Sequence, residues 1–349
     1  MFIDFYNNTD PLTARGLYQR QDTRHLVQNP PAPVLTQSAF DALYDLDFEH
    51  DQHPFYARQG SVRALDTIRF SITTHRGCHG ECNFCAIAVH QGQTVSWRSA
   101  PSILKEARDL SARPDFKGII HDVGGPTANM YGYECKKKLK KGCCQDKRCL
   151  FPEICPQMPV DHNPQTRLLK KLAALPGIKK VFVASGIRYD LILADKAGGA
   201  PYLQQLVDRH VSGQLKIAPE HMEDHVLALM GKPANAQLVE FKQRFDHLSA
   251  RADKRQFLTY YFIAAHPGCN LADMRKLGGF VRRRLKINPE QVQIFTPTPS
   301  TFATLMYYTG RDPFTGQKVY VEKATRSKIA QKEALLKKTR MGSKKPGRG

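Results

Sequence analysis

Hydrophobic and polar positions follow two different periods along the middle of the chain, from Asp66 to about Pro299. Short runs rich in β-branched and aromatic residues predict strands, and stretches in which apolar residues recur every three or four positions predict helices. The expected strands are Thr67–Thr74, Gly118–Val123, Lys180–Ala184, Gln214–Ala218, Gln256–Ile263 and Gln291–Phe295. The expected helices are Pro101–Ser111, Pro164–Leu175, Pro201–Val211, Met222–Met230, Asn235–Leu248 and Asn270–Leu285. This alternation indicates βα units around a parallel sheet, arranged as an open barrel or as a doubly wound sheet.

The two ends of the chain follow neither pattern. Residues 1–65 are rich in Asn, Pro, Gln and His, so we expect an irregular N-terminal extension with few regular elements. Residues 66–310 form the predicted core, and residues 311–349 form a basic C-terminal tail. Within that tail, Ser327–Arg340 is expected to be helical and Met341–Gly349 to be solvated and disordered.

The composition excludes wholesale disorder and a membrane-spanning helix. The chain has 349 residues, of which 41% are hydrophobic, so it can bury a sizeable core and wholesale disorder is excluded. No run approaches 18 consecutive apolar residues, which excludes a predicted membrane-spanning helix and a membrane partner. The N-terminus lacks a basic segment followed by an apolar run, so we expect a cytoplasmic protein. In that reducing compartment, nine cysteines favour metal or cluster binding over a disulfide framework.

The positive charge is large and uneven. The formal net charge is +20, and the segment from Gln317 to Gly349 alone carries eleven Lys or Arg against two acidic residues. A second basic run lies between Lys136 and Lys141. Such runs can follow the phosphates of RNA, but a solubilising tail explains them equally well.

The most informative segment directly follows the first expected strand. Cys78, Cys82 and Cys85 are spaced C-x3-C-x2-C, so three thiolates can converge on one iron–sulfur cube from a single loop. Clusters that only carry electrons usually have four Cys ligands, so three local ligands leave one iron open for reaction. The alternative is a structural zinc site that borrows His75, His79 or a distant cysteine.

The loop resembles the signature of radical S-adenosylmethionine (SAM) enzymes, C-x3-C-x-aromatic-C, with Phe84 as the aromatic residue. Further segments at the ends of successive expected strands resemble the YgiQ-type uncharacterised radical SAM proteins, which are similar to the methylthiotransferase branch. These segments are Asp122–Gly132, Ala184–Asp190, Ile217–His221, Ala265–Gly268 and Ile294–Thr301. Members of that family have a longer N-terminal region, of which residues 1–65 correspond to the end.

The resemblance implies a partial (β/α)6 TIM-like barrel with its chemistry at the C-terminal ends of the strands. It implies that Gly124 and Gly125 meet the amino group of SAM, with Pro126 where Glu is commoner. Arg188 is the candidate for the methionine carboxylate, and the candidates at the ribose are Ser185 and Glu220. The alternatives are an ion pair between Arg188 and Asp190, and a helix-capping role for Glu220.

The activity implied is that of a radical SAM enzyme. Cys78, Cys82 and Cys85 bind three irons of a [4Fe–4S] cluster, SAM chelates the fourth iron, and an electron from a low-potential donor cleaves SAM to a 5′-deoxyadenosyl radical. That radical abstracts hydrogen from an unknown substrate, for which RNA is a candidate. No catalytic side chain is assigned. The alternative is a non-catalytic iron–sulfur or zinc protein that binds nucleic acid.

A second group of cysteines falls in an unusually long connection, an insertion at about residues 126–163. Its members are Cys135, Cys143, Cys144, Cys149 and Cys155. Long connections without periodic structure are usually functional or disordered, and five cysteines favour a metal that organises this one. An auxiliary iron–sulfur cluster and a structural zinc are both open, with free thiols as the third possibility. The lack of C-x2-C pairs favours the cluster.

Overall fold

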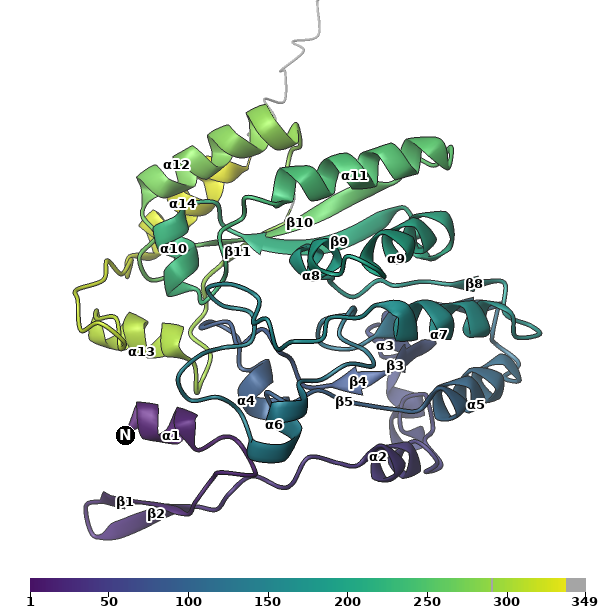
Figure 1. The fold of residues 1–349 in the computed structure, drawn as a ribbon, viewed down its shortest axis with the longest axis horizontal. Coiled ribbons are helices and arrows are strands. Elements are labelled where there is room, and N and C mark those ends of the chain that lie inside the picture. Colours follow the sequence, from purple (N-terminus) through teal and green to yellow (C-terminus); the bar gives the residue numbers. More distant parts are fainter. Residues whose placement is uncertain (290, 337–349) are drawn as a thin grey trace, which may run out of the picture.

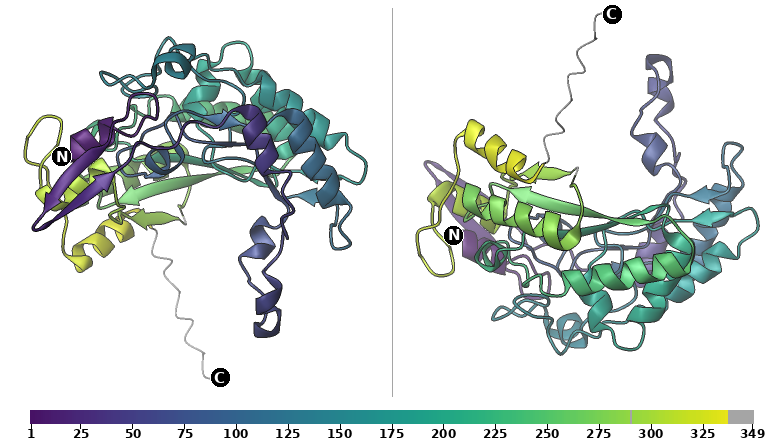
Figure 2. Two further views of the ribbon diagram at one scale, coloured as in Figure 1. Left: turned by 90° about the horizontal axis from the view of Figure 1, so that it is seen from below. Right: turned by 90° about the horizontal axis from the view of Figure 1, so that it is seen from above.

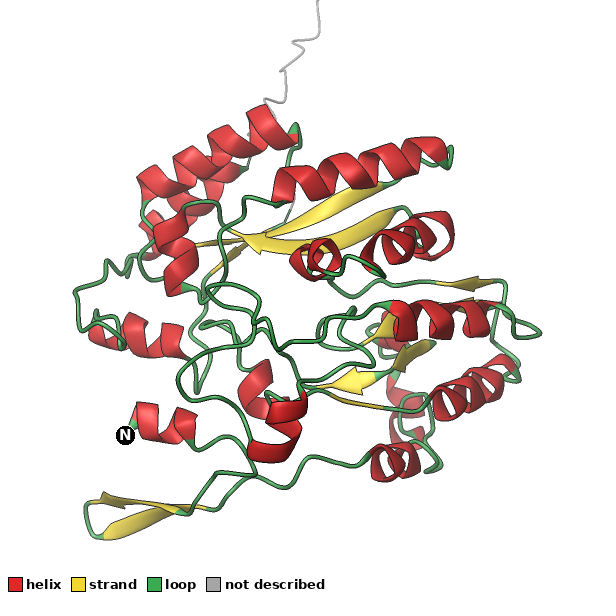
Figure 3. Ribbon diagram, viewed as in Figure 1, coloured by secondary structure: helices red, strands yellow, loops and turns green. Residues whose placement is uncertain are grey.

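The computed structural model describes residues 1–289 and 291–336 and has a mixed α/β fold (Figures 1 and 3). The strands of its βα units pair in parallel, in the order in which the units occur. β3 (Ser71–Thr73) pairs with β7 (Asp122–Gly124), and β6 (Ile119–Ile120) pairs with β8 (Lys180–Val181). β9 (Gln214–Glu220), β10 (Phe257–Ala264) and β11 (Val292–Ile294) form a three-stranded sheet in the order β11-β10-β9. Within the described residues β3 and β11 are not paired with each other, so these strands do not close into a barrel.

Helices lie between successive strands of the βα units, and two more follow the last strand, β11. They are α5 (Ala100–Ser111), α7 (Asn163–Ala173), α8 (Tyr189–Ala194), α9 (Gly199–Gln205), α10 (Asp224–Leu229), α11 (Leu238–Arg251), α12 (Leu271–Phe280), α13 (Phe302–Thr309) and α14 (Thr325–Leu335). Two π-helical turns, η2 (Leu206–His210) and η3 (Val281–Leu285), continue α9 and α12. The predicted helices therefore exist, with ends shifted by a few residues, whereas the short α8 and α13 were not expected.

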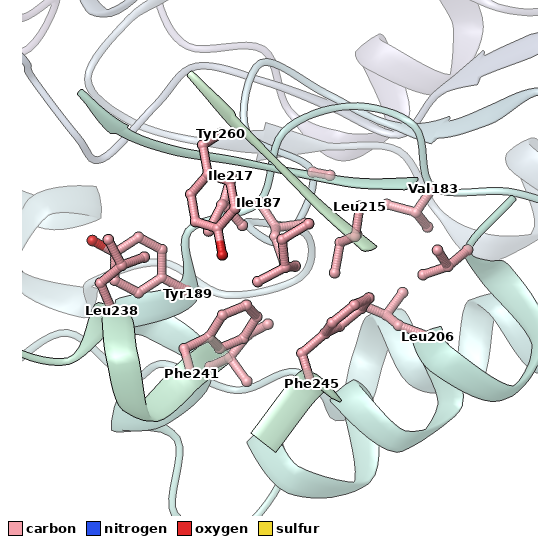
Figure 4. Close-up of a cluster of buried hydrophobic side chains, with 14 of the residues drawn as sticks. Val183, Ile187, Tyr189, Leu206, Leu215, Ile217, Leu238, Phe241, Phe245 and Tyr260 are labelled. Atoms are coloured by element: carbon pink, nitrogen blue, oxygen red, sulfur yellow. The ribbon is translucent and has the colours of Figure 1, made fainter. Parts of the chain in front are cut away.

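The main core lies between the sheet and these helices (Figure 4). Phe241 and Phe245, one turn apart on α11, are fully buried and face Leu215 and Ile217 of β9. Burying each aromatic side chain contributes roughly 1.5–3 kcal/mol to stability. This packing fixes β9, whose C-terminal end reaches the site described below.

The N-terminal region is more regular than predicted. It contains α1 (Phe2–Asn7), an antiparallel hairpin of β1 (Leu17–Gln21) and β2 (Arg24–Gln28), α2 (Gln37–Leu43), the 3₁₀ turn η1 (Pro54–Gln59) and α3 (Leu65–Ile68). The expectation of few elements was wrong because local turn and cap chemistry creates them. Asp22 has a left-handed φ of 51° in the hairpin turn, and the Thr36 side chain caps α2. The hairpin lies at the lower edge of the molecule in Figure 1, and the segment between α2 and β3, which contains η1, projects from the body in Figure 2.

Most predicted strands are longer than the observed ones, but β9 extends two residues beyond its prediction and β10 has the predicted length. Thr67 and Ile68 belong to α3, and only residues 71–73 of the first expected strand are extended. A second, antiparallel pairing of β4 (His75–Arg76) with β5 (Ser96–Trp97) brackets the first cysteine loop, which includes α4 (Ile87–Gln91). No helix in the described parts of the chain is both long and apolar enough to cross a membrane. The end of the predicted basic tail, residues 337–349, lies outside the described residues.

Candidate functional site

The first three cysteines lie at the rim of a cavity of about 610 Å3. Cys78, Cys82 and Cys85 line this cavity, which also reaches Arg188 after β8 and Glu220 at the end of β9. Backbone hydrogen bonds fix the cysteine loop, from the Cys78 N–H to the Gly92 carbonyl (3.1 Å) and from the Asn83 N–H to the Met230 carbonyl (2.8 Å). The loop therefore holds its three thiols against the C-terminal ends of the parallel strands.

A glycine is required where the chain enters this loop. Gly77 has a φ of 87°, and a Cβ built there would lie 2.4 Å from the Thr94 carbonyl oxygen. Only glycine tolerates both this left-handed conformation and this close approach. The backbone can therefore turn sharply between β4 and Cys78.

The spacing of the sulfur atoms fits several irons better than one ion. Among the described residues, no three cysteines bring their sulfurs within 4.8 Å of one another. Four thiolates around a single tetrahedral zinc at 2.3 Å would lie about 3.8 Å apart. His75 is also not free to complete a zinc site, because its ring nitrogens contact the Thr74 hydroxyl (2.8 Å) and the Thr127 carbonyl (3.0 Å). His79 keeps a buried nitrogen, Nε2, without a hydrogen-bond partner, so the spacing of the sulfur atoms is the observation that favours a cluster in which each thiolate binds a different iron.

Cys82 and Cys85 of this loop are only partly accessible to solvent. Burial raises the pKa of Cys85 to about 12, and burial also raises the pKa of Cys82, although the nearby cations Lys232 and Arg188 oppose that shift. Such thiols stay protonated at neutral pH unless a metal takes the place of the proton. Burial therefore favours ligation over a role as free nucleophiles.

Arg188 forms the ion pair that was the alternative to SAM binding, and it also lines the cavity. Its guanidinium pairs with Asp190, with Nε 3.0 Å from Asp190 Oδ1. Its backbone is fixed by Asn129, which accepts from the Arg188 N–H (2.8 Å) and donates to the Arg188 carbonyl (2.9 Å). The Arg188 Nη1 atom lies 3.3 Å from the position of a Cβ built on Gly80, so this atom approaches the cysteine loop.

His162 belongs to the support of Arg188. Its Nδ1 donates to Asp195 (2.9 Å), and its Nε2 lies 3.1 Å from the Asn129 amide nitrogen. Burial raises the pKa of Asp195, but hydrogen bonds from His162 and from the backbone of Gly198 outweigh this and hold the pKa well below its usual value. Both His162 nitrogens are thus occupied, so this histidine is not available to the second cysteine group.

Glu220 turns into the cavity instead of capping a helix. It has a strained φ of 66°, and the N-terminal cap of α10 is Glu223. The Glu220 Oε2 atom is buried without a hydrogen-bond partner, and Oε1 lies 3.7 Å from the Lys232 ammonium. Burial raises the pKa of Glu220, and Lys232 and Arg188 act against that shift. The orphaned oxygen is a ready acceptor for a ligand in this cavity.

Lys232 is the main residue that the sequence analysis missed. It lines the cavity between the cysteine loop and Glu220, and its ammonium donates to the Ala218 carbonyl. The residue follows Gly231, which has a left-handed φ of 65°, in the connection between α10 and α11. The Gly-Lys-Pro turn was the available signal, but nothing in the sequence indicates which way the lysine points.

The remaining predicted SAM contacts lie beside the cavity and are not among its lining residues. The Ser185 hydroxyl donates to Asp122, so its one donor is already engaged. Gly124 packs against Ser185, with 3.5 Å between a Cβ built on the glycine and the serine Cβ. A Cβ on Gly125 would lie 2.6 Å from His75 Nε2, so this glycine allows two backbone segments to meet.

The second cysteine group divides in two. Cys135, Cys144, Cys149 and Cys155 line one small cavity. Cys143 lines a different one, to which Cys144 also contributes, and the Cys143 backbone N–H donates to Asp10 (2.8 Å). The basic run between them forms α6 (Lys136–Lys141). Lys138 in this run is buried and the other lysines are exposed, so phosphate binding by the run stays a prediction.

Comparisons with known proteins agree with the resemblance given by the motifs. The family model described as Radical SAM N-terminal matches residues 1–71, and a domain of unknown function, DUF3362, matches residues 290–340. A UPF0313 protein of Fusobacterium nucleatum is 56% identical over 337 residues, which are 97% of this chain and 59% of that protein. A UPF0313 protein of Thermotoga maritima is 48% identical over 328 residues, which are 94% of this chain and 57% of that protein. The chain thus spans less than two thirds of the length of these curated relatives.

Two solved structures align with much of the chain. The cobalamin-dependent SAM radical enzyme OxsB, with aqua-cobalamin and SAM bound, aligns with 84% of this chain and 35% of its own at a TM-score of 0.47 and 14% identity. The radical SAM methyltransferase TsrM from Kitasatospora setae, with cobalamin and a [4Fe–4S] cluster bound, aligns with 78% of this chain and 48% of its own at a TM-score of 0.44 and 14% identity. Likenesses at this level carry no argument about activity. The sequence matches confirm the resemblance to an uncharacterised radical SAM family.

Proposed function

Given this confirmed resemblance to an uncharacterised radical SAM family, we propose that the chain carries the core of an enzyme that binds a [4Fe–4S] cluster and SAM. One observation carries the proposal: Cys78, Cys82 and Cys85 share a single cavity with Arg188 and the orphaned oxygen of Glu220. When bound, the cluster and SAM supply the reductive cleavage that yields a 5′-deoxyadenosyl radical, which abstracts hydrogen from a substrate. The order of parallel pairings supports a partial (β/α)6 barrel that opens between β3 and β11.

Different side chains of the cavity would contact different parts of the cluster and of SAM. The three thiolates hold the cluster at one edge. Arg188 and Lys232 bring positive charge toward the methionine carboxylate, and the free Glu220 oxygen accepts a hydrogen bond from the ribose or the amino group. Gly124, Gly125 and Ser185 adjoin residues that line the cavity, which supports, as a further proposal, contacts of the two glycines with the amino group of SAM and of Ser185 with its ribose.

The substrate and the electron donor are further proposals. The net charge of +20 supports an anionic macromolecule such as RNA as the substrate. Cluster reduction requires a low-potential donor, which is consistent with a cytoplasmic location. The alternative of a non-catalytic nucleic-acid-binding protein predicts a cluster without SAM cleavage.

Anaerobic reconstitution with iron and sulfide tests the proposal. Adding SAM should change the electron spin resonance spectrum of the reduced cluster, and dithionite should then release 5′-deoxyadenosine. Replacing Cys78, Cys82 and Cys85 together by Ala should abolish both responses. A SAM-induced spectral change that survives in this triple variant would overturn the assignment, and a cluster that never yields 5′-deoxyadenosine would favour the binding protein.

A pair of variants tests Arg188. Arg188→Ala should weaken SAM binding by roughly 1.5–3 kcal/mol, because a charge-assisted hydrogen bond is lost. Asp190→Asn is the matched control, since it removes the partner of Arg188 but leaves the guanidinium in place. Equal losses of SAM affinity in both variants would show that the ion pair matters only for structure.

A further inference from the structure

The insertion between β7 and α7 brings four of its five cysteines together. Cys135, Cys144, Cys149 and Cys155 line a cavity of about 100 Å3. Cys143 belongs elsewhere, because it faces the N-terminal segment around Asp10. The structure thus places four of the five cysteines around one cavity, whereas the sequence did not distinguish among the five.

Backbone turns and hydrogen bonds within the insertion place these four cysteines around the cavity. Cys135 lies at the start of α6, and Gly142, with a left-handed φ of 81°, ends that helix and turns the chain toward Cys144. The Cys155 N–H donates to the Cys149 carbonyl (2.8 Å), which closes a turn between these two ligands. The start of α6, the turn at Gly142 and the turn between Cys149 and Cys155 therefore position the four thiols around one cavity.

Positive charge surrounds the four thiols. The Lys137 ammonium lies 3.3 Å from Cys144 Sγ, and the Lys138 ammonium lies 3.8 Å from Cys149 Sγ. Lys147 and Arg148 also line the cavity. Four thiolates that bind a metal centre leave a net negative charge, which these cations offset.

The spacing of the sulfur atoms is wider than a single zinc ion requires. No three sulfurs of the described cysteines lie within 4.8 Å of one another, whereas four thiolates on one zinc lie about 3.8 Å apart. The cavity is also several times larger than the roughly 10–15 Å3 that a single water requires. We propose that Cys135, Cys144, Cys149 and Cys155 bind a second iron–sulfur cluster, independent of Cys78, Cys82 and Cys85.

The second site adjoins the first cysteine loop. Cys78 and Cys149 pack against the same small core of Val95, Met130, Leu150 and Leu191. Lys138 spans the two sites, because its ammonium lies 3.3 Å from His79 Nδ1 as well as near Cys149. Each site nevertheless draws its ligands from its own loop, so each can be emptied separately.

The test uses the full chain in which Cys78, Cys82 and Cys85 are replaced by Ala. After anaerobic reconstitution, this variant should retain iron and acid-labile sulfide. Adding Cys144→Ser should remove both, whereas adding Cys143→Ser, the neighbouring residue, should leave both unchanged. Zinc without sulfide would overturn the cluster in favour of a zinc site, and the absence of both metals would show that the four residues are only thiols.

A second measurement separates loss of the site from loss of the fold. In the otherwise unchanged chain, Cys144→Ser should lower the bound iron by about half if the two clusters have equal iron content. The first cluster should still respond to SAM by electron spin resonance, with Cys143→Ser as the control. Equal iron loss in the Cys143→Ser and Cys144→Ser variants would contradict the ligand set, whatever the first cluster does.

Discussion

Gly125 is placed where the chain after β7 meets the loop after β3. A Cβ at this position would lie 2.7 Å from the backbone carbonyl oxygen of His75, which cannot move without breaking the β4–β5 pairing. Gly186 in the same region has no heavy atom within 4 Å of the position that a Cβ would take. A Gly→Ala substitution there adds the same methyl group without a steric clash. Substituting Ala at each glycine therefore shows whether steric crowding or backbone flexibility requires a glycine at Gly125.

We expect Gly125→Ala to lower the free energy of unfolding by about 1–3 kcal/mol, the usual cost of forcing an extra carbon into a packed region. Gly186→Ala should change it by less than about 0.5 kcal/mol. Urea unfolding followed by circular dichroism measures both values. A Gly125→Ala variant as stable as its Gly186→Ala control would show that the two loops can separate at no cost.

Helix α5 illustrates how one element is anchored. The Ser99 hydroxyl accepts a hydrogen bond from the Ser102 N–H (3.3 Å), and Pro101 occupies the first turn. The buried face of the helix, which includes Ile103 and Leu110, packs into the main core. The cap therefore fixes where the helix begins, and the apolar face fixes how it packs.

We expect Ser99→Ala to destabilise the protein by about 1 kcal/mol, because the loss of the cap leaves a helix N–H without its partner. Ser111→Ala, at the other end of α5, is the matched control, since the Ser111 hydroxyl only donates to a carbonyl one turn earlier. Thermal unfolding should show a lower midpoint for Ser99→Ala alone. Similar midpoints for both variants would argue that water replaces the cap.

Over the whole molecule, the N-terminal segment ties distant parts of the chain together. The Tyr6 hydroxyl donates to Glu81 in the first cysteine loop (3.0 Å), and the Tyr6 ring packs 4.4 Å from that of Phe302 in α13. Asp10 accepts from the Cys143 N–H in the insertion. Residues that are hundreds of positions apart in the sequence therefore line one cavity, which has a volume of about 440 Å3.

We expect Tyr6→Ala to lower the free energy of unfolding by about 2 kcal/mol, through lost aromatic packing and an unpaired, half-buried Glu81. Tyr18→Ala is the control, because Tyr18 is 72% exposed on the β1–β2 hairpin. Limited proteolysis should cleave the 142–149 segment faster in the Tyr6→Ala variant only. Unchanged cleavage would mean that the N-terminal segment covers the insertion without supporting it.

The sequence alone determined the βα alternation, the three-cysteine loop and the family resemblance, because these depend on periodicity and on spacing within one loop. It missed the N-terminal elements, which depend on single turn and cap residues such as Asp22 and Thr36. Only the tertiary structure decided which cysteines of the insertion converge, that Lys232 enters the cavity and that Glu220 keeps a free oxygen there. Those features arise where separate loops meet at the strand ends, and local sequence does not encode the direction of a side chain in a loop.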